Sequence, residues 1–128
     1  MMSQNDDVVR DNMCSAFQME SAEEAYRHIK EGYCVLIDYG PVAYGNRLYT
    51  WDSGGRLLVK CKKCGKLLLV QLSEYHGIDD DNNYCDYFPI AGKKDADFLN
   101  RRYDGFAIER EFDHRYLQVT DGEARWSK

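Results

Sequence analysis

Residues 56–72 of this chain read RLLVKCKKCGKLLLVQL, two aliphatic runs on either side of a short polar segment. Runs that are rich in leucine and valine and bounded by polar residues or glycine favour β-strands. Because these two runs are apolar at nearly every position, they are typical of strands covered on both faces. The stretch therefore predicts two central strands of a sheet.

Further runs of strand-like composition lie on both sides of this stretch, separated by segments rich in glycine, asparagine and aspartate. They are YCVLIDY from residue 33, NRLYTWD from 46, YCDYFPI from 84, FAIEREF from 106 and RYLQV from 115. An antiparallel meander is the simplest topology for such a series. Asp52-Ser53-Gly54-Gly55 is predicted to form the hairpin turn that leads into the first central strand.

A helix is predicted to begin after Ser21, because Ser21 and Glu24 form a capping box that satisfies backbone N–H groups of the first turn. We expect it to end near Glu31, with Gly32 in the left-handed conformation that often follows a helix. Its apolar residues recur at three- and four-residue steps and form a stripe that packs on the sheet: Ala22, Ala25, Tyr26 and Ile29.

Two further helices are predicted. One spans residues 95–104, begins with Asp95 as its cap and ends at Gly105. The other runs from Asp6 to Gln18, where apolar residues lie four positions apart.

The size and composition of the chain indicate one globular domain. It has 128 residues, of which 44% are hydrophobic and 30% charged. The fold class is α+β: a single domain over 1–128, mainly an antiparallel sheet of five to seven strands with two or three helices packed against it. Residues 1–20 are expected at its periphery. Residues 122–128 are expected to fray, although Trp126 is able to anchor them.

Charge and cysteine content bound the function classes. The formal net charge is −5, whereas a domain that grips the nucleic-acid backbone usually carries a basic face. The first ten residues lack the features of a secretory signal, and no apolar run is long enough to span a bilayer. Five irregularly spaced cysteines favour free thiols or metal ligands over a disulfide framework. We therefore expect a cytoplasmic protein.

The segment Cys61-Lys62-Lys63-Cys64-Gly65 joins the two central strands. Two thiolates three residues apart on a tight turn can bind one tetrahedral zinc ion, and the glycine lets backbone amides approach the sulfurs. Over residues 58–70 the chain resembles half of a zinc ribbon, with strand, knuckle and strand in order. The resemblance implies a second pair of ligands, for which His76 and Cys85 are the nearest candidates.

Other interpretations of the knuckle stay open at this point. It is also compatible with a simple hairpin tip, in which Gly65 is left-handed and the cysteines are small apolar groups, or with a redox dithiol. The basic residues around it form either a positive face or a solvated tip: Arg56, Lys60, Lys62, Lys63 and Lys66. Cys34, in an apolar strand, is expected to fill the core.

A second group of residues combines aromatic and acidic side chains. Tyrosine concentrates at protein interfaces, and carboxylates beside it suit a basic partner. The predicted partner-binding residues are Tyr75, Asp79, Asp80, Asp81, Tyr84 and Tyr87. The alternative is that the tyrosines are half-buried strand residues and the aspartates a solvated turn.

These features rank three functions. The first is a small intracellular binding protein, an inhibitor or immunity-type partner of a basic protein such as a nuclease. The second is a zinc-knuckle module that contacts nucleic acid through its lysine-rich hairpin. An enzyme that uses His76 with nearby aspartates ranks last, because no nucleophile elbow, phosphate-binding loop or HExxH motif appears in the chain.

Overall fold

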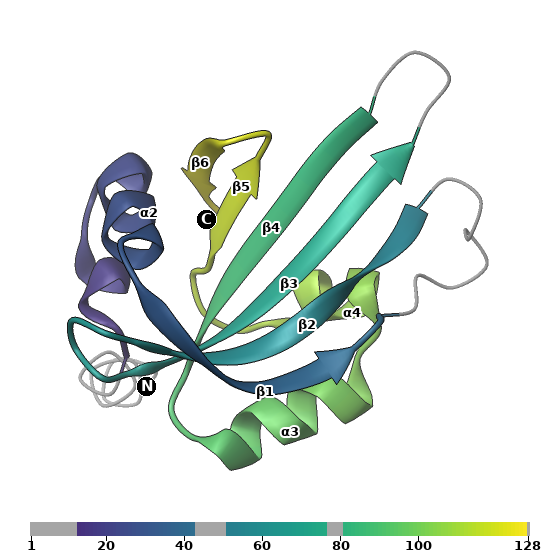
Figure 1. Ribbon diagram of the computed structural model, residues 1–128, viewed down its shortest axis with the longest axis horizontal. Helices are drawn as coiled ribbons and strands as arrows, with labels where there is room; N and C mark the ends of the chain where they lie inside the picture. The colour runs from purple at the N-terminus through teal and green to yellow at the C-terminus, as the bar shows by residue number, and fades with distance from the viewer. Residues whose placement is uncertain (1–12, 43–50, 77–80, 128) are drawn as a thin grey trace.

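The structure is a computed structural model that describes residues 13–42, 51–76 and 81–127 (Figure 1). Six strands form one antiparallel sheet in sequence order. The strands are β1 (Tyr33–Gly40), β2 (Trp51–Cys61), β3 (Leu67–His76), β4 (Asp81–Ile90), β5 (Leu117–Thr120) and β6 (Glu123–Trp126). The helices are η1 (Ser15–Gln18), α2 (Ala22–Lys30), α3 (Lys93–Arg102) and α4 (Gly105–Glu111). The predicted α+β meander is confirmed.

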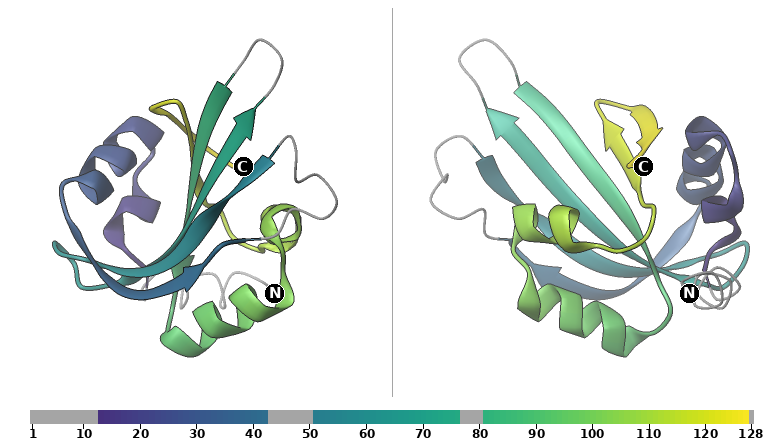
Figure 2. Two further views of the ribbon diagram at one scale, coloured as in Figure 1. Left: turned by 45° about the vertical axis from the view of Figure 1, so that its right-hand side comes forward. Right: turned by 180° about the vertical axis from the view of Figure 1, so that it is seen from behind.

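The central strands are buried on both faces, as their apolar runs predict. Val59, Leu68 and Val70 belong to a core with η1 and α2, whereas Leu58 and Leu69 belong to a second core with α3 and α4. Figures 1 and 2 show the two helical layers on opposite sides of the sheet. Because adjacent residues of a strand point to opposite faces, consecutive residues such as Leu58 and Val59, or Leu68 and Leu69, are buried by opposite layers.

The predicted start of α2 is confirmed, since the Oγ of Ser21 accepts a hydrogen bond from the N–H of Glu24 at 3.2 Å. The expected left-handed conformation of Gly32 is wrong: the described glycines with positive φ are Gly40, Gly65 and Gly122. The backbone of Gly32 instead accepts the N–H of Lys62 at 3.2 Å. This contact ties the end of α2 to the β2–β3 turn.

Two turn predictions differ from the structure. Residues 52–55 lie inside β2, where Ser53 pairs with Ser73 and a bulge precedes Gly55. The expected strand FAIEREF is the helix α4. A helix forms there because Asp104 caps it, with Oδ1 2.8 Å from the N–H of Ala107, and because Ile108 and Phe112, four residues apart, both face the core.

The remaining helices differ mainly in their boundaries. α3 begins at Lys93, two residues before its predicted start, and Gly92 occupies the cap position. Its apolar face is as predicted, with Ala96 buried in the core and Leu99 and Tyr103 packed against it. Most of the helix predicted from Asp6 lies outside the described residues, which include only η1 at its end. No helix in the described ranges is long and apolar enough to cross a membrane.

The C-terminal tail is ordered as β6 instead of frayed, and Trp126 anchors it as predicted. The indole Nε1–H of Trp126 donates to the carbonyl of Glu20 at 2.9 Å. The guanidinium of Arg115 lies 3.8 Å from the centre of the Trp126 ring and donates to the carbonyls of Phe17 and Met19. The terminal hairpin thereby holds the segment that joins η1 to α2.

A buried polar row crosses the sheet beneath α3 and α4. Arg56 is only 1% exposed. Its guanidinium donates to the side chain of Gln71 and to the carbonyl of Tyr103, while Gln71 donates to the carbonyl of Gly105. Arg56 is therefore not part of a positive surface around the knuckle, as its place in the sequence suggested, because its guanidinium binds the end of α3 instead.

Asp86 continues this row on β4, opposite Gln71, and is buried. Burial, followed by the charge and hydrogen bond of Glu109, raises the pKa of Asp86 to about 9. The folded protein therefore holds a proton on Asp86 that the unfolded chain releases above its ordinary pKa of 3.8. The contribution of Asp86 to stability is largest in acid and is lost as the pH rises.

We predict that the free energy of unfolding falls between about pH 4 and pH 9, by at most about 1.4 kcal/mol for each pH unit from this group. Asp86→Asn should flatten the curve, because the amide stays neutral throughout. Urea unfolding over a pH series, with the exposed Asp95→Asn as control, measures the difference. Parallel curves for the wild type and Asp86→Asn contradict the assignment.

Candidate metal centre

Four side chains from three segments meet at the tip of the β2–β3 hairpin, which lies beside η1 and α2 (Figure 1). Cys14 directly precedes η1, His28 lies on α2, Cys61 ends β2, and Cys64 lies in the turn that follows. Their ligand atoms all lie within 4.8 Å of one another. The Nε2 of His28 is 3.5 Å from the Sγ of Cys61. A group of three thiols and an imidazole this close can hold a metal ion.

The turn itself presents its two sulfurs through backbone geometry. Gly65 has a φ of 74°, which confirms the predicted left-handed glycine. Its N–H donates to the carbonyl of Cys61 at 2.9 Å, and the N–H of Cys61 donates to the carbonyl of Lys66 at 2.9 Å. The turn is therefore closed by two hydrogen bonds, with both thiols on its inner side.

The last turn of α2 is attached to the knuckle at two points besides His28. The N–H of Lys62 donates to the carbonyl of Gly32 at 3.2 Å, and the ammonium of Lys63 pairs with the carboxylate of Glu31. His28 lies one turn before these contacts. They therefore position the imidazole against the sulfurs.

The surroundings of the cluster shift the pKa values of Cys14 and Cys64 in opposite directions. Burial raises the pKa of Cys14, and the neighbouring Cys64 and Cys61 raise it further. Burial also acts to raise the pKa of Cys64, but hydrogen bonds from the backbone N–H groups of Lys66 and Ser15, together with those from the thiols of Cys14 and Cys61, outweigh it and lower the value. Backbone N–H groups thus stabilise a thiolate at Cys64, the form that binds metal.

The imidazole of His28 is also in its metal-binding form. Burial, followed by the positive charge of Lys63, lowers its pKa, with Glu31 acting weakly in the opposite direction. A lowered pKa keeps the ring neutral near pH 7. A neutral imidazole has a nitrogen lone pair to give to a metal.

The cluster includes the predicted Cys61 and Cys64, but Cys14 and His28 stand where His76 and Cys85 were expected. His76 ends β3, nine residues from Leu67, a separation of about 30 Å at the usual strand rise. Its side chain lies outside the described residues. Cys85 lies within β4, paired with Leu72 and Val119. A hairpin carries the residues that follow its turn away from the tip, so ligands after Cys64 move out of reach.

The predicted partner-binding residues do not form one surface among the residues that the structure describes. Tyr84 is half-buried at the edge of a groove, whereas Tyr87 is 5% exposed and packs in the core against Tyr26. Tyr87 is therefore a core residue, because its strand position faces α2. Asp79 and Asp80 lie outside the described residues, as do the side chains of Tyr75 and Asp81.

Cys34 also differs from its prediction. It was expected in the core, but its side chain is exposed on β1, at the edge of the sheet. Among the described strands only β2 borders β1, so part of its apolar run faces outward together with Val35 and Leu36. Cys34 is not one of the four clustered residues, so substitution of its thiol serves as a control for substitutions in the cluster.

We predict that Gly65→Ala lowers the free energy of unfolding by about 1–2 kcal/mol. The cost is backbone strain, because an added Cβ would meet only the Cε of Lys60, at an ordinary 3.7 Å. Gly65→Asn should cost less, since asparagine tolerates positive φ better than alanine. Chemical unfolding of the three proteins measures the order. Equal stabilities for alanine and glycine at this position would contradict the role of the turn.

Known proteins add no information about this site. No protein-family model, no curated protein and no solved structure matches the chain significantly. What the cluster does follows from its donor atoms and its place in the fold.

Proposed function

We propose that this protein is a zinc-stabilised binding protein without catalytic activity, in which Cys14, His28, Cys61 and Cys64 hold one zinc ion. The observation that carries the proposal is the convergence of their four ligand atoms within 4.8 Å. Around a tetrahedral zinc such atoms lie about 3.5–3.8 Å apart, from metal–ligand distances of 2.0–2.3 Å. The separation of 3.5 Å between His28 and Cys61 already fits this geometry.

The donor set favours zinc over other common cations. Thiolate sulfur and imidazole nitrogen suit zinc, whereas magnesium and calcium prefer oxygen ligands. Three cysteines and one histidine are a usual composition for a structural zinc site. Three thiolates leave such a centre with one net negative charge, and the ammonium group of Lys62 in the same turn offsets it.

A structural role has more support than a catalytic one. Four protein ligands complete a tetrahedral shell, whereas a catalytic zinc keeps one position for water or substrate. Cys14 and Cys61 are also almost fully buried, so a substrate has little access to the metal. The redox-dithiol interpretation has less support, because the Cys61–Cys64 pair lies against two further metal-binding side chains.

The proposed zinc would crosslink three segments that are distant in sequence. Cys14 and Cys61 are 47 positions apart, and closing a loop of this length in the unfolded chain is worth on the order of 4 kcal/mol. η1 has four residues and α2 has nine, lengths at which isolated helices are unstable in water. A crosslink to the rigid hairpin supports both elements.

A protein partner has more support than nucleic acid. Arg56 is buried and Lys63 is paired with Glu31, which reduces the basic surface expected at the hairpin to Lys60, Lys62 and Lys66. The net charge of −5 opposes phosphate binding over the rest of the molecule. Inhibition of a basic protein therefore stays our first functional prediction. The five unpaired thiols support a reducing location such as the cytoplasm.

We predict one zinc ion per chain in the purified protein, measured by elemental analysis. Cobalt substituted for zinc should give the d–d absorption and thiolate charge-transfer bands of a tetrahedral sulfur-rich site. Cys14→Ser and Cys61→Ser should lose the metal and lower the thermal midpoint. Once free zinc exceeds the dissociation constant, each further tenfold increase in its concentration should add about 1.4 kcal/mol to the free energy of unfolding of the wild type.

Matched controls separate this ligand set from the one that the sequence suggested. Cys34→Ser and Cys85→Ser, each lacking one thiol outside the cluster, should retain one zinc and the wild-type midpoint, and so should His76→Gln. The proposal is contradicted if the wild type, after a chelator has removed its metal, is as stable as it was before. Loss of zinc in Cys85→Ser with retention in Cys14→Ser would restore the original ligand prediction.

A further inference from the structure

The sheet face that carries α2 is covered over only part of its length. The last covered row of paired residues is Val70, Tyr87 and Leu117, all of them buried. The next row along the same face is Leu72, Cys85 and Val119. There Leu72 is 41% exposed, although it continues the apolar run of a central strand. Leu72 therefore leaves apolar surface at this end of the sheet.

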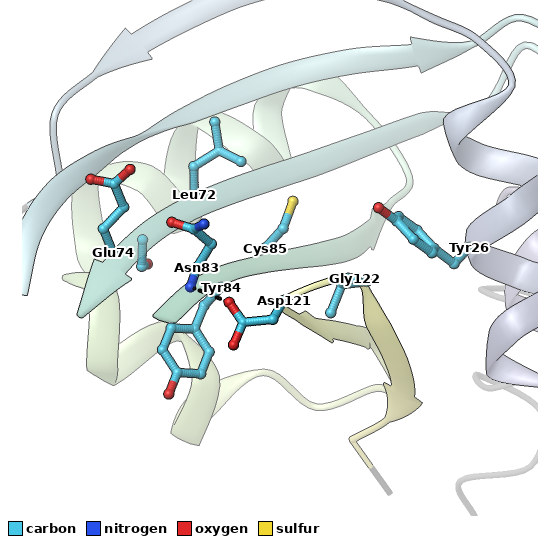
Figure 3. Close-up of a pocket in the computed structure, with 10 residues that line it drawn as sticks. Tyr26, Leu72, Glu74, Asn83, Tyr84, Cys85, Asp121 and Gly122 are labelled. Carbon is cyan, nitrogen blue, oxygen red and sulfur yellow. Dashed lines mark hydrogen bonds between the residues drawn. The ribbon is translucent and has the colours of Figure 1, made fainter. Parts of the chain in front are cut away.

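A groove of about 780 Å³ lies over this row, in which Leu72 is exposed, Cys85 half-buried and Val119 buried. Tyr26 of α2 forms one wall, and the turn between β5 and β6, at Asp121 and Gly122, forms the other. Figure 3 shows Tyr26 pointing from α2 toward the strand that carries Cys85, and Asp121 on the opposite side pointing toward Asn83. The floor of the groove is the sheet itself.

The charged residues that line the groove in the described part of the chain are acidic. Its lining includes the carboxylates of Glu74 and Asp121, and the described lining residues include no lysine, arginine or histidine. Asp121 is fixed in place, because its Oδ1 accepts the N–H of Asn83 at 2.9 Å and its own N–H donates to the carbonyl of Asn83 at 2.9 Å. A carboxylate accepts several hydrogen bonds at once, so this contact leaves capacity for a cation.

The aromatic wall is fixed by two contacts. The Nζ of Lys30 lies 4.9 Å from the centre of the Tyr26 ring, a distance at which the ring electrons attract its ammonium. Tyr26 is packed against Tyr87 on its inner side, with ring centres 6.2 Å apart. The ring is therefore held in place at the groove by the core.

We propose that this groove is the docking site for an extended segment of a partner protein that carries lysine or arginine. The inference rests on the proposed binding function and names the chemistry of the partner. Lysine and arginine combine an aliphatic stem, which can lie on Leu72, with a cationic end that can reach Glu74 and Asp121. The net charge of −5 attracts the same class of partner at longer range.

The test uses the full-length, zinc-loaded chain and a fluorescent peptide rich in lysine and arginine. We expect saturable binding that weakens with added salt, and amide shifts in NMR spectra concentrated at residues 72–74, 83–85 and 119–122. Glu74→Gln combined with Asp121→Asn should weaken binding roughly five- to thirtyfold. Asparagine at 121 tolerates the positive φ of 50° there. Leu72→Lys should weaken binding through repulsion.

The matched control is Asp95→Asn combined with Glu111→Gln, which removes the same charge from α3 and α4 on the opposite face of the sheet. Binding to this variant should equal that of the wild type. The proposal is overturned if both double variants weaken binding equally, because charge alone then explains the affinity. Absence of binding by the wild type, or shifts centred on α3, α4 or the knuckle, also overturns it.

Metal content keeps this inference separate from the zinc centre. Zinc measured in each groove variant should remain at one ion per chain, since none of the changed residues is a ligand. Loss of peptide binding at unchanged zinc content, confined to the groove variants, supports the docking site. If the zinc-loaded wild type does not bind the peptide, the docking site is ruled out and the metal centre is unaffected. If the wild type contains no zinc but binds the peptide, the metal centre is ruled out and the docking site is unaffected.

Discussion

The structure depends on covering both faces of its two central strands, β2 and β3. Their apolar side chains alternate between two cores, so neither face can be left to water without a large cost in free energy. On one face α3 and α4 form a layer that the buried side chains of Arg56 and Gln71 hold through the backbone at the helix ends. The other face is covered by shorter elements, which need support of a different kind.

That support comes from two places on the α2 side. At the hairpin tip, Cys14 and His28 meet the two knuckle cysteines, and near the C-terminus Trp126 and Arg115 bind the backbone between η1 and α2. Each contact joins a short element to the sheet and offsets part of the conformational entropy that these helices lose on folding. Both supports act on the layer formed by η1 and α2.

The metal centre and the groove share α2. His28 faces the knuckle cysteines, while Tyr26, two residues earlier, forms a wall of the groove. A ligand that fixes His28 therefore also restricts the helix that carries Tyr26. An ordered wall costs a binding partner less entropy than a mobile one. The position of α2 thus connects the stability of the fold with the shape of the groove.

Elements with local signals could be predicted from the amino-acid sequence. Apolar runs predicted buried central strands, Ser21 and Glu24 predicted the start of α2, and the hairpin-tip interpretation of residues 61–65 predicted a left-handed Gly65. Long-range packing brings the other residues to the cluster: no spacing rule joins Cys14 and His28 to the knuckle, and they lie there because their segments pack against the hairpin tip. FAIEREF had strand-like alternation, but the cap at Asp104 and the packing of Ile108 made it a helix. Local patterns record how a segment is buried, whereas the partners of a side chain depend on how whole layers pack.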